Sequence, residues 1–183
     1  MKIILILSTL LISNLSCSQK MDNKLNITLK DFETKNQTEL FYKIADEVTS
    51  RKIYSDNVEK FENPLKNLIY IIIMDGEVSN GGLIQFIENS SGDNFEETLK
   101  ALNEIKATEY VKILESIKTL FPNGYLPKDT GERRKLIDEL DSKKNQEELW
   151  KMEEIYEDYN KQYYNNIKNL EKHTIEYLKN NIK

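Results

Sequence analysis

The side chains that most often carry catalysis are scarce in this 183-residue sequence. Its single histidine, His173, lies in a helical pattern near the C-terminus, whereas a hydrolase triad needs a histidine beside a nucleophile. Zinc sites need several Cys or His ligands, and the chain has one of each. The sequence also lacks a P-loop and a Gly-x-Gly-x-x-Gly element. These observations favour a protein without enzymatic activity and without a cofactor.

Three carboxylates near the middle of the chain are the remaining candidates for chemistry. Asp75, Glu77 and Glu88 have the ligand type for a hard cation, or for a catalytic carboxylate pair. Their spacing in the sequence does not fix the distances between them. Helix capping accounts for Glu77 more simply, so we expect no metal site here.

The segment over residues 75–92 differs from a generic helix. Its adjacent glycines, Gly81 and Gly82, each cost a helix about 1 kcal/mol relative to alanine. Because glycine has no Cβ atom, another helix or a ligand can approach the backbone closely at these positions. Gln85 and Asn89 are one helical turn apart and offer amide groups along one side.

A helix boundary is expected inside this segment. We expect Gly76 to end one helix and Asn80 to cap the next. Glu77 would then accept hydrogen bonds from the free N–H groups of the new helix, helped by the helix dipole.

The segment resembles the signature of the DNA-mimic protein family. The residues that match are Glu77, Val78, Asn80, Gly81, Gly82, Gln85, Phe86, Asn89 and Gly92. Ser79, Leu83 and Ile87 depart from the family's usual Asn and aromatic residues. Later stretches that also look like the family pattern are Phe121-Pro122-Asn123-Gly124, Arg133-Arg134 and Trp150. The resemblance implies an all-α domain that binds protein and presents carboxylates as imitation DNA phosphates. It leaves two roles for the motif residues, a structural role, which we favour, and a binding role.

The charge pattern excludes a duplex DNA binder and favours a basic protein partner. The chain carries 26 basic and 31 acidic residues, whereas a DNA-binding protein needs a concentrated basic surface. Residues 75–104 contain seven acidic residues and one basic residue, Lys100, and such a patch attracts a basic partner. Besides Glu77, its acidic candidates for partner binding are Asp75, Glu88, Asp93, Glu96, Glu97 and Glu104.

The N-terminus has the pattern of a bacterial lipoprotein signal. Met1-Lys2 precedes a ten-residue apolar run over residues 3–12, which is too short to span a bilayer as a helix. Ser16 then precedes Cys17, the single cysteine, as in a lipobox, although Asn14 stands where leucine is usual. We therefore predict a signal peptide over residues 1–16, lipid on Cys17, and anchoring in the bacterial cell envelope. Ordinary secretion with a free thiol is the alternative.

The remaining chain predicts one all-α domain. Residues 17–36 read as a polar tether, with a short ordered segment around residues 25–32, and residues 37–183 as a bundle of about seven helices. Expected helices cover residues 37–49, 64–75, 80–90, 94–105, 108–121 and 133–140, followed by a long helical region from Glu147. The second is apolar nearly all round and belongs at the centre, with a buried strand over residues 68–74 as the rival. The tyrosine-rich stripe of the last region indicates one long helix, two consecutive helices, or a coiled-coil seam.

Together these features predict a lipid-anchored, non-enzymatic helical module that binds a basic protein through its acidic face. The alternative is an inhibitor, an immunity-like protein or a DNA mimic that occupies the nucleic-acid site of its partner. A homodimer remains open. Export argues against literal DNA mimicry, because an anchored envelope protein does not meet a cytoplasmic regulator.

Overall fold

The computed structural model describes residues 26–33, 36–51, 53 and 58–181. These residues form α-helices and short 3-10 turns, with no strand among them. The helices are α1 (Gln37–Ser50), α2 (Leu65–Glu88), α3 (Phe95–Glu104), α4 (Thr108–Lys118), α5 (Thr130–Ser142), α6 (Gln146–Asn165) and α7 (Ile167–Asn181). The 3-10 turns are η1 (Leu29–Glu33), η2 (Val58–Lys60), η3 (Ser90–Asn94) and η4 (Pro122–Gly124). The all-α, seven-helix prediction is confirmed, and the rival strand over residues 68–74 is wrong because that stretch lies within α2.

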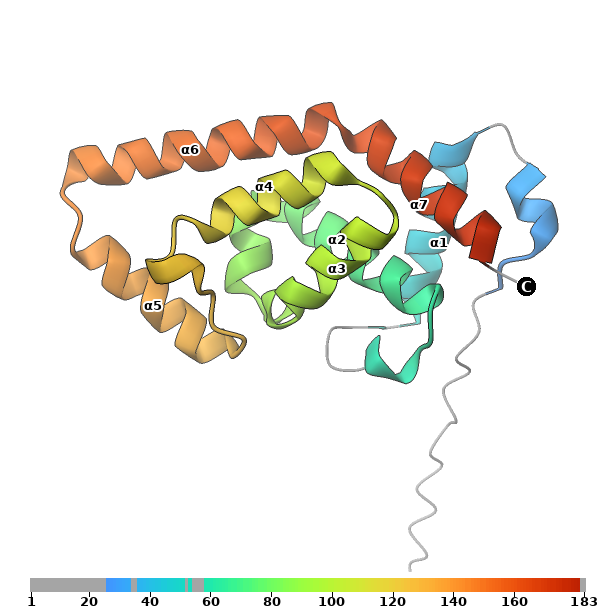
Figure 1. Ribbon diagram of the computed structural model, residues 1–183, viewed down its shortest axis with the longest axis horizontal. Helices are drawn as coiled ribbons and strands as arrows, with labels where there is room; N and C mark the ends of the chain where they lie inside the picture. Colours follow the sequence, from blue (N-terminus) through green and yellow to red (C-terminus); the bar gives the residue numbers. More distant parts are fainter. Residues whose placement is uncertain (1–25, 34–35, 52, 54–57, 182–183) are drawn as a thin grey trace, which may run out of the picture.

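Helix α2 forms the centre of the molecule (Figure 1), where it packs against α1, α3, α5, α6 and α7. Its side chains Leu68, Ile69, Ile71 and Met74 are completely buried. A helix that is apolar on all sides must be covered on all sides, and the neighbouring helices supply that cover.

The break in α2 lies later than expected. The helix continues through Gly76, and its backbone leaves helical geometry only at Gly81 (φ −156°, ψ 23°) and Gly82 (φ 76°, ψ −176°). One interior glycine costs about 1 kcal/mol, which the burial of Met74 and Val78 on either side of Gly76 offsets. Asn80 is therefore the last residue before the break and not the cap of a new helix.

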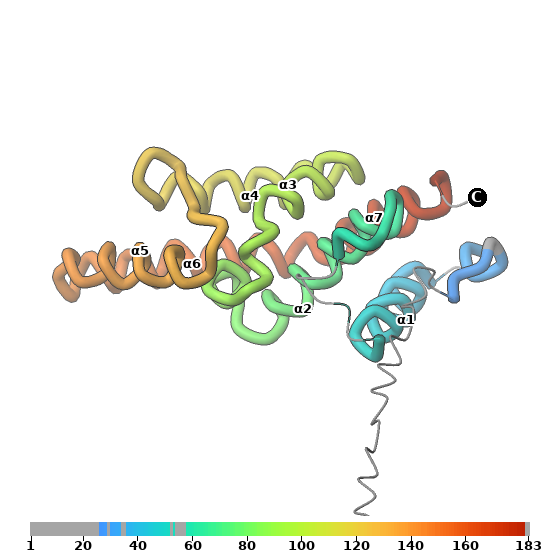
Figure 2. The backbone as a smooth tube through the Cα atoms, turned by 90° about the horizontal axis from the view of Figure 1, so that it is seen from below, coloured from blue at the N-terminus to red at the C-terminus, as the bar shows by residue number. Residues whose placement is uncertain are grey.

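Two consecutive helices close the bundle. Helix α6 begins with a capping box, in which Asn145 and Glu148 exchange side-chain and backbone hydrogen bonds, and it ends at Asn165, with Asn166 as its C-cap before α7. Figures 1 and 2 place α1, α7 and residues 26–33 at one end of the molecule, and α5 with the start of α6 at the other. Tyr163 is the one residue of the tyrosine stripe that α6 buries completely. The stripe therefore packs onto the body of the protein near the end of α6, and the start of the helix projects beyond it.

Residues 26–33, at the end of the expected tether, contact the helical body. The backbone N–H of Asn26 donates to the carboxylate of Glu47 at 2.8 Å, and Asp31 pairs with Lys43 at 2.6 Å. Phe32 is buried against the core. The sequence predicts a short ordered segment around residues 25–32, but not the contact of Phe32 with the core, because one buried aromatic residue leaves no periodic pattern.

The predicted signal peptide and Cys17 lie outside the described residues. Within the part of the chain that is described, no helix has the length and apolar character needed to cross a membrane.

Candidate functional site

The motif begins with Glu77, whose carboxylate holds two side-chain amides. Gln85 Nε2 and Asn89 Nδ2 each donate to Glu77 Oε2 at 2.8 Å. The expectation that Glu77 caps the free N–H groups of a new helix is therefore wrong. The break at Gly81 and Gly82 turns the following helical segment so that the amides, and not the backbone, reach the carboxylate.

The two adjacent glycines serve close packing, as their types predict. Gly82 adopts a positive φ, and a Cβ atom there would lie 2.7 Å from Asn160 Nδ2. Asn160, from α6, accepts the backbone N–H of Leu83 at 2.9 Å, so it caps the second part of α2 from outside. A Cβ atom on Gly81 would lie 2.1 Å from Gln85 Oε1. Gly82 thus lets α6 approach, and Gly81 makes room for the amide that binds Glu77.

A completely buried arginine, Arg133, fastens the other end of the motif. Its Nη1 donates to the carbonyls of Pro127 at 2.9 Å and Lys128 at 2.8 Å, and its Nε donates to the carbonyl of Ile87. Its Nη2 donates to the carbonyl of Asn89 at 2.6 Å and to Asp93 Oδ1 at 2.9 Å. These five contacts equal the five N–H donors of a guanidinium group. Arg133 therefore ties the end of α2 and η3 to the loop before α5.

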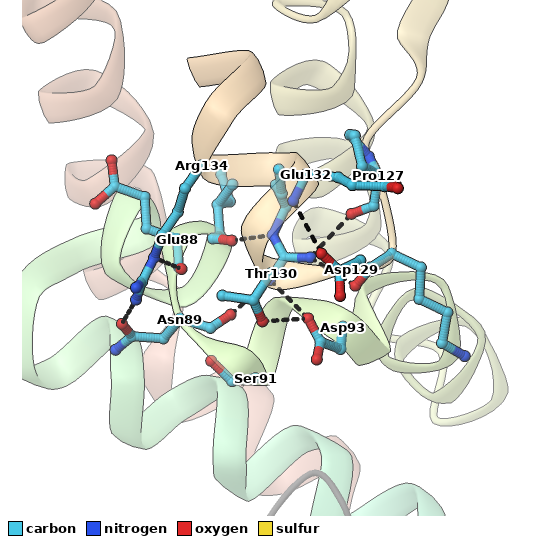
Figure 3. Close-up of polar contacts among 12 residues, drawn as sticks. Glu88, Asn89, Ser91, Asp93, Pro127, Asp129, Thr130, Glu132 and Arg134 are labelled. Carbon is cyan, nitrogen blue, oxygen red and sulfur yellow. Dashed lines mark hydrogen bonds and ion pairs between the residues drawn. The ribbon is translucent and has the colours of Figure 1, made fainter. Parts of the chain in front are cut away.

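Arg134 and Thr130 add to these contacts, and we call these two residues, together with Arg133, the clamp (Figure 3). Arg134 donates from Nε to the carbonyl of Glu88 at 2.7 Å and from Nη2 to Asn89 Oδ1 at 3.1 Å, and Thr130 donates to Asp93 Oδ1 at 2.7 Å. A Cβ atom on Gly92 would lie 2.9 Å from Arg133 Nη2. Three of the four polar motif residues, Glu77, Gln85 and Asn89, are thus engaged within the fold, which supports the structural role, whereas Asn80 is exposed.

The six acidic candidates do not form one free face. Asp75 is 6% exposed, so its carboxylate cannot meet a partner, and this expectation is corrected. A count of charges along the sequence contains no information on burial, and Asp75 lies where other helices cover α2. Asp93 is held by Arg133, as described above.

Cations from other segments neutralise part of the remaining set. Glu96 pairs with Lys118 at 2.6 Å and Glu97 with Lys128 at 3.2 Å. Glu104 accepts hydrogen bonds from the side chains of Asn67 and Tyr177. Glu88 is half-buried at the edge of a groove, and it is the one candidate of the six whose side-chain carboxylate has no hydrogen bond or ion pair to the described residues.

Sequence reasoning missed a second acidic surface, on α6. This helix carries six exposed acidic residues and two lysines. Three of them, Glu153, Glu154 and Glu157, form no ion pair with any described residue. They line a shallow hollow together with Lys161 and Trp150, whose side chain is 59% exposed. Their crowding within five positions was visible in the sequence, although lysines elsewhere in the chain concealed it in the overall count of charges.

A family model described as DMP19-like protein matches residues 59–181. The chain belongs to the DMP19-like protein family. This confirms the resemblance stated from the motif, and the matched residues include the motif, Arg133 and α6 of this DMP19-like protein. No curated protein and no solved structure matches the chain.

This DMP19-like protein buries a carboxylate among tyrosines on the inner side of α2. Tyr163 donates to Asp75 Oδ1 at 2.8 Å, and Tyr110 donates to the backbone carbonyl of Tyr163 at 3.0 Å. Burial raises the pKa of Asp75, the negative charge of buried Glu171 raises it further, and the hydrogen bond from Tyr163 opposes both effects. In the described residues no group of three or more His, Cys, Asp or Glu side chains is arranged to hold a metal ion.

We expect Asp75→Asn to remove a pH-dependent cost to stability. Because the pKa of Asp75 is higher in the folded chain than in the unfolded chain, its ionised form destabilises the folded state. That cost disappears as the pH falls through the raised pKa towards the ordinary value of 3.8. The free energy of unfolding of the variant minus that of the wild type should therefore be most positive at alkaline pH and decrease on acidification. Chemical denaturation of both proteins over a pH series measures this difference, and a difference independent of pH would contradict it.

Proposed function

We propose that this protein is a non-enzymatic binding module of the bacterial cell envelope that presents carboxylates to a basic protein partner. The observation that carries the proposal is the acidic surface of α6, with six exposed acidic residues against two lysines. Membership of a family named for a DNA mimic fits this surface, because a DNA mimic places carboxylates at the positions where the basic residues of its partner bind DNA phosphates.

The acidic surface has the properties of a recognition site. Glu153, Glu154 and Glu157 lie within about one helical turn, and their uncompensated charge attracts a cationic surface over roughly one Debye length. Trp150 stands among them, and exposed tryptophan is enriched at the energetic centres of protein interfaces. Most of the acidic residues in the segment 75–104, by contrast, form hydrogen bonds or ion pairs within the protein.

The envelope location rests on the N-terminal sequence. A lone cysteine after a short apolar run and a small residue is the substrate pattern of lipoprotein processing. Labelled palmitate should be incorporated into the wild-type chain and not into Cys17→Ala. Equal labelling of both chains would remove the anchor from the proposal and leave the binding surface to be tested separately.

Affinity capture from envelope extract tests the binding surface with two variants that lose the same charge. The α6 triple variant carries Glu153→Gln, Glu154→Gln and Glu157→Gln. The control triple variant carries Glu33→Gln, Asp46→Asn and Glu176→Gln. The control residues are exposed and lie on η1, α1 and α7, at the opposite end of the molecule.

We expect the wild type and the control triple variant to retain a basic protein at low salt that the α6 triple variant loses at least tenfold. High salt should release it, because ions screen exposed charges. Equal recovery by all three proteins would overturn the proposal.

Elution with duplex DNA distinguishes the alternative function. Release of the captured protein by DNA, at a salt concentration that alone releases nothing, identifies its nucleic-acid site as the surface that is covered. That result would assign the DNA-mimic or inhibitor role. Retention in the presence of DNA would assign binding to another basic surface.

A further inference from the structure

A groove of about 470 Å³ runs between α5, α6 and the second part of α2. Its apolar floor comes from several elements distant in the sequence: Ile84, Leu120, Ile137, Leu140, Leu149 and Met152. The volume lies within the range of ligand-binding clefts, which is roughly 300 to 1,000 Å³.

The groove exists because the first half of α6 is not packed into the core. Leu149 and Met152 remain half-buried, although they continue the stripe that ends in buried Tyr163. Of α5, Arg133 and Ile137 are the two buried residues, and Arg133 is used in the clamp. The hairpin of α5 and α6 therefore leaves an apolar seam that no described part of the chain fills.

The rim of the groove is acidic. Glu88, Asp141, Glu153 and Glu157 line it together with a single lysine, Lys144, which pairs with Asp141 at 2.7 Å. Four carboxylates against one ammonium group leave a net negative rim around an apolar floor. Burial is the main cause that raises the pKa of the groove residue Tyr156 to about 12, and the negative charges of Asp141 and Glu88 raise it further.

We propose that this groove binds one face of a short, basic amphipathic helix of the partner protein. Apolar side chains of that helix would enter the seam, and its lysines or arginines would meet the four rim carboxylates. The part of α6 that lines the groove runs from Gln146 to Asn160, about 20 Å at 1.5 Å per residue, which is long enough to lie beside several turns of helix. The acidic rim disfavours fatty acids and anionic lipids, whose own charge it would repel. This inference rests on the proposed function and names the kind of partner element that it requires.

The test uses two labelled synthetic peptides of equal length and equal positive charge. In the first, leucine and lysine are placed at helical spacing so that one face is apolar, and in the second serine replaces every leucine. Fluorescence anisotropy at low salt measures the binding of each. We expect the leucine peptide to bind at least tenfold more tightly than the serine peptide.

Variants of α6 locate the binding. Leu149→Asn with Met152→Asn makes the floor polar at half-buried positions, and it should weaken binding of the leucine peptide at least tenfold while leaving the serine peptide unaffected. Ile155→Asn is the matched control, because this apolar residue is half-buried on the same helix and does not line the groove; it should leave binding of the leucine peptide unchanged. Circular dichroism confirms that each variant keeps its helical content.

Each outcome separates this inference from the proposed function. Equal binding of both peptides, unaffected by the floor variant, would overturn the groove and leave the acidic surface intact. Absence of binding by both peptides would overturn the proposed binding in the groove, while the capture experiment with the α6 triple variant decides the proposed function independently. Sedimentation equilibrium tests whether a second copy of this chain occupies the groove. A wild-type dimer that the floor variant converts to a monomer would overturn the proposal that a partner helix binds there. A monomer in both cases excludes the second copy and so supports the partner helix.

Discussion

Replacing Arg133 with leucine is expected to lower the free energy of unfolding by about 3 to 5 kcal/mol, because each buried carbonyl that loses its hydrogen-bond donor costs about 1 to 3 kcal/mol and the guanidinium serves several of them. The substitution leaves Asp93 without its buried cation and removes the donor from four backbone carbonyls. Chemical denaturation monitored by circular dichroism measures the loss. A decrease below about 1 kcal/mol would show that the clamp contributes no more than an exposed ion pair does.

Two companion substitutions make this test specific. Arg133→Lys keeps the charge, but an ammonium group has three donors and lacks the planar fork, so it should recover only part of the loss. Arg134→Gln is the matched control: its residue is exposed and makes two of the clamp's contacts, and we expect a change of about 1 kcal/mol or less. Hydrogen exchange should increase in η3 and α5 of Arg133→Lys, because these are the segments that the guanidinium joins.

Local pattern was sufficient to predict several helices. The apolar spacing in α1 and the start of α4 at Thr108 agree with the structure because one buried face and a terminus are encoded within a few turns. The prediction that Gly76 ends a helix is wrong. The helix continues because Met74 and Val78, on either side of Gly76, are completely buried. Tertiary burial outweighs the modest local cost of glycine at that position, and no local pattern contains that information.

The candidate site was harder to predict because electrostatics depends on residues distant in the sequence. Counting acids over residues 75–104 gave a free acidic patch, but Lys118 and Lys128 reach Glu96 and Glu97 from other elements. Asp75 is covered by Tyr163, which lies 88 positions away. A count along the chain cannot see these partners. The same count hid the acidic residues of α6, because it included lysines that lie elsewhere on the molecule.

The motif is better understood as a joint than as a binding surface. Glu77 holds the segment after the glycine break, Asn160 caps it from α6, and Arg133 fixes its end to α5. These contacts determine where α5 and α6 stand relative to α2, and the groove and the acidic surface lie on those two helices. The motif would therefore act on partner binding by positioning, so its variants should affect stability first.

Gly92→Ala is the substitution of a motif residue that tests this joint most directly. A Cβ atom at this position would lie 2.6 Å from the carbonyl oxygen of Ile87, 2.8 Å from that of Phe86 and 2.9 Å from Arg133 Nη2. Overpacking of a filled interior costs about 1 to 3 kcal/mol, and we expect a loss in the free energy of unfolding near the upper end because two of the three atoms belong to the backbone. Gly92 does not have a positive φ, so the loss measures close packing and not backbone strain.

Gly76→Ala supplies the opposite expectation in the same helix. No atom lies within 4 Å of a Cβ atom placed at Gly76, and its backbone is helical, so alanine should raise the free energy of unfolding by about 0.5 to 1 kcal/mol. Denaturation of both variants under identical conditions gives two changes of opposite sign if the joint is as described. A stabilising Gly92→Ala would mean that the Arg133 guanidinium does not occupy the space beside Gly92, and the clamp would lose its geometric basis. A destabilising Gly76→Ala would mean that the backbone at Gly76 is not helical, because alanine fits a helix without strain and would disturb only a break at this position.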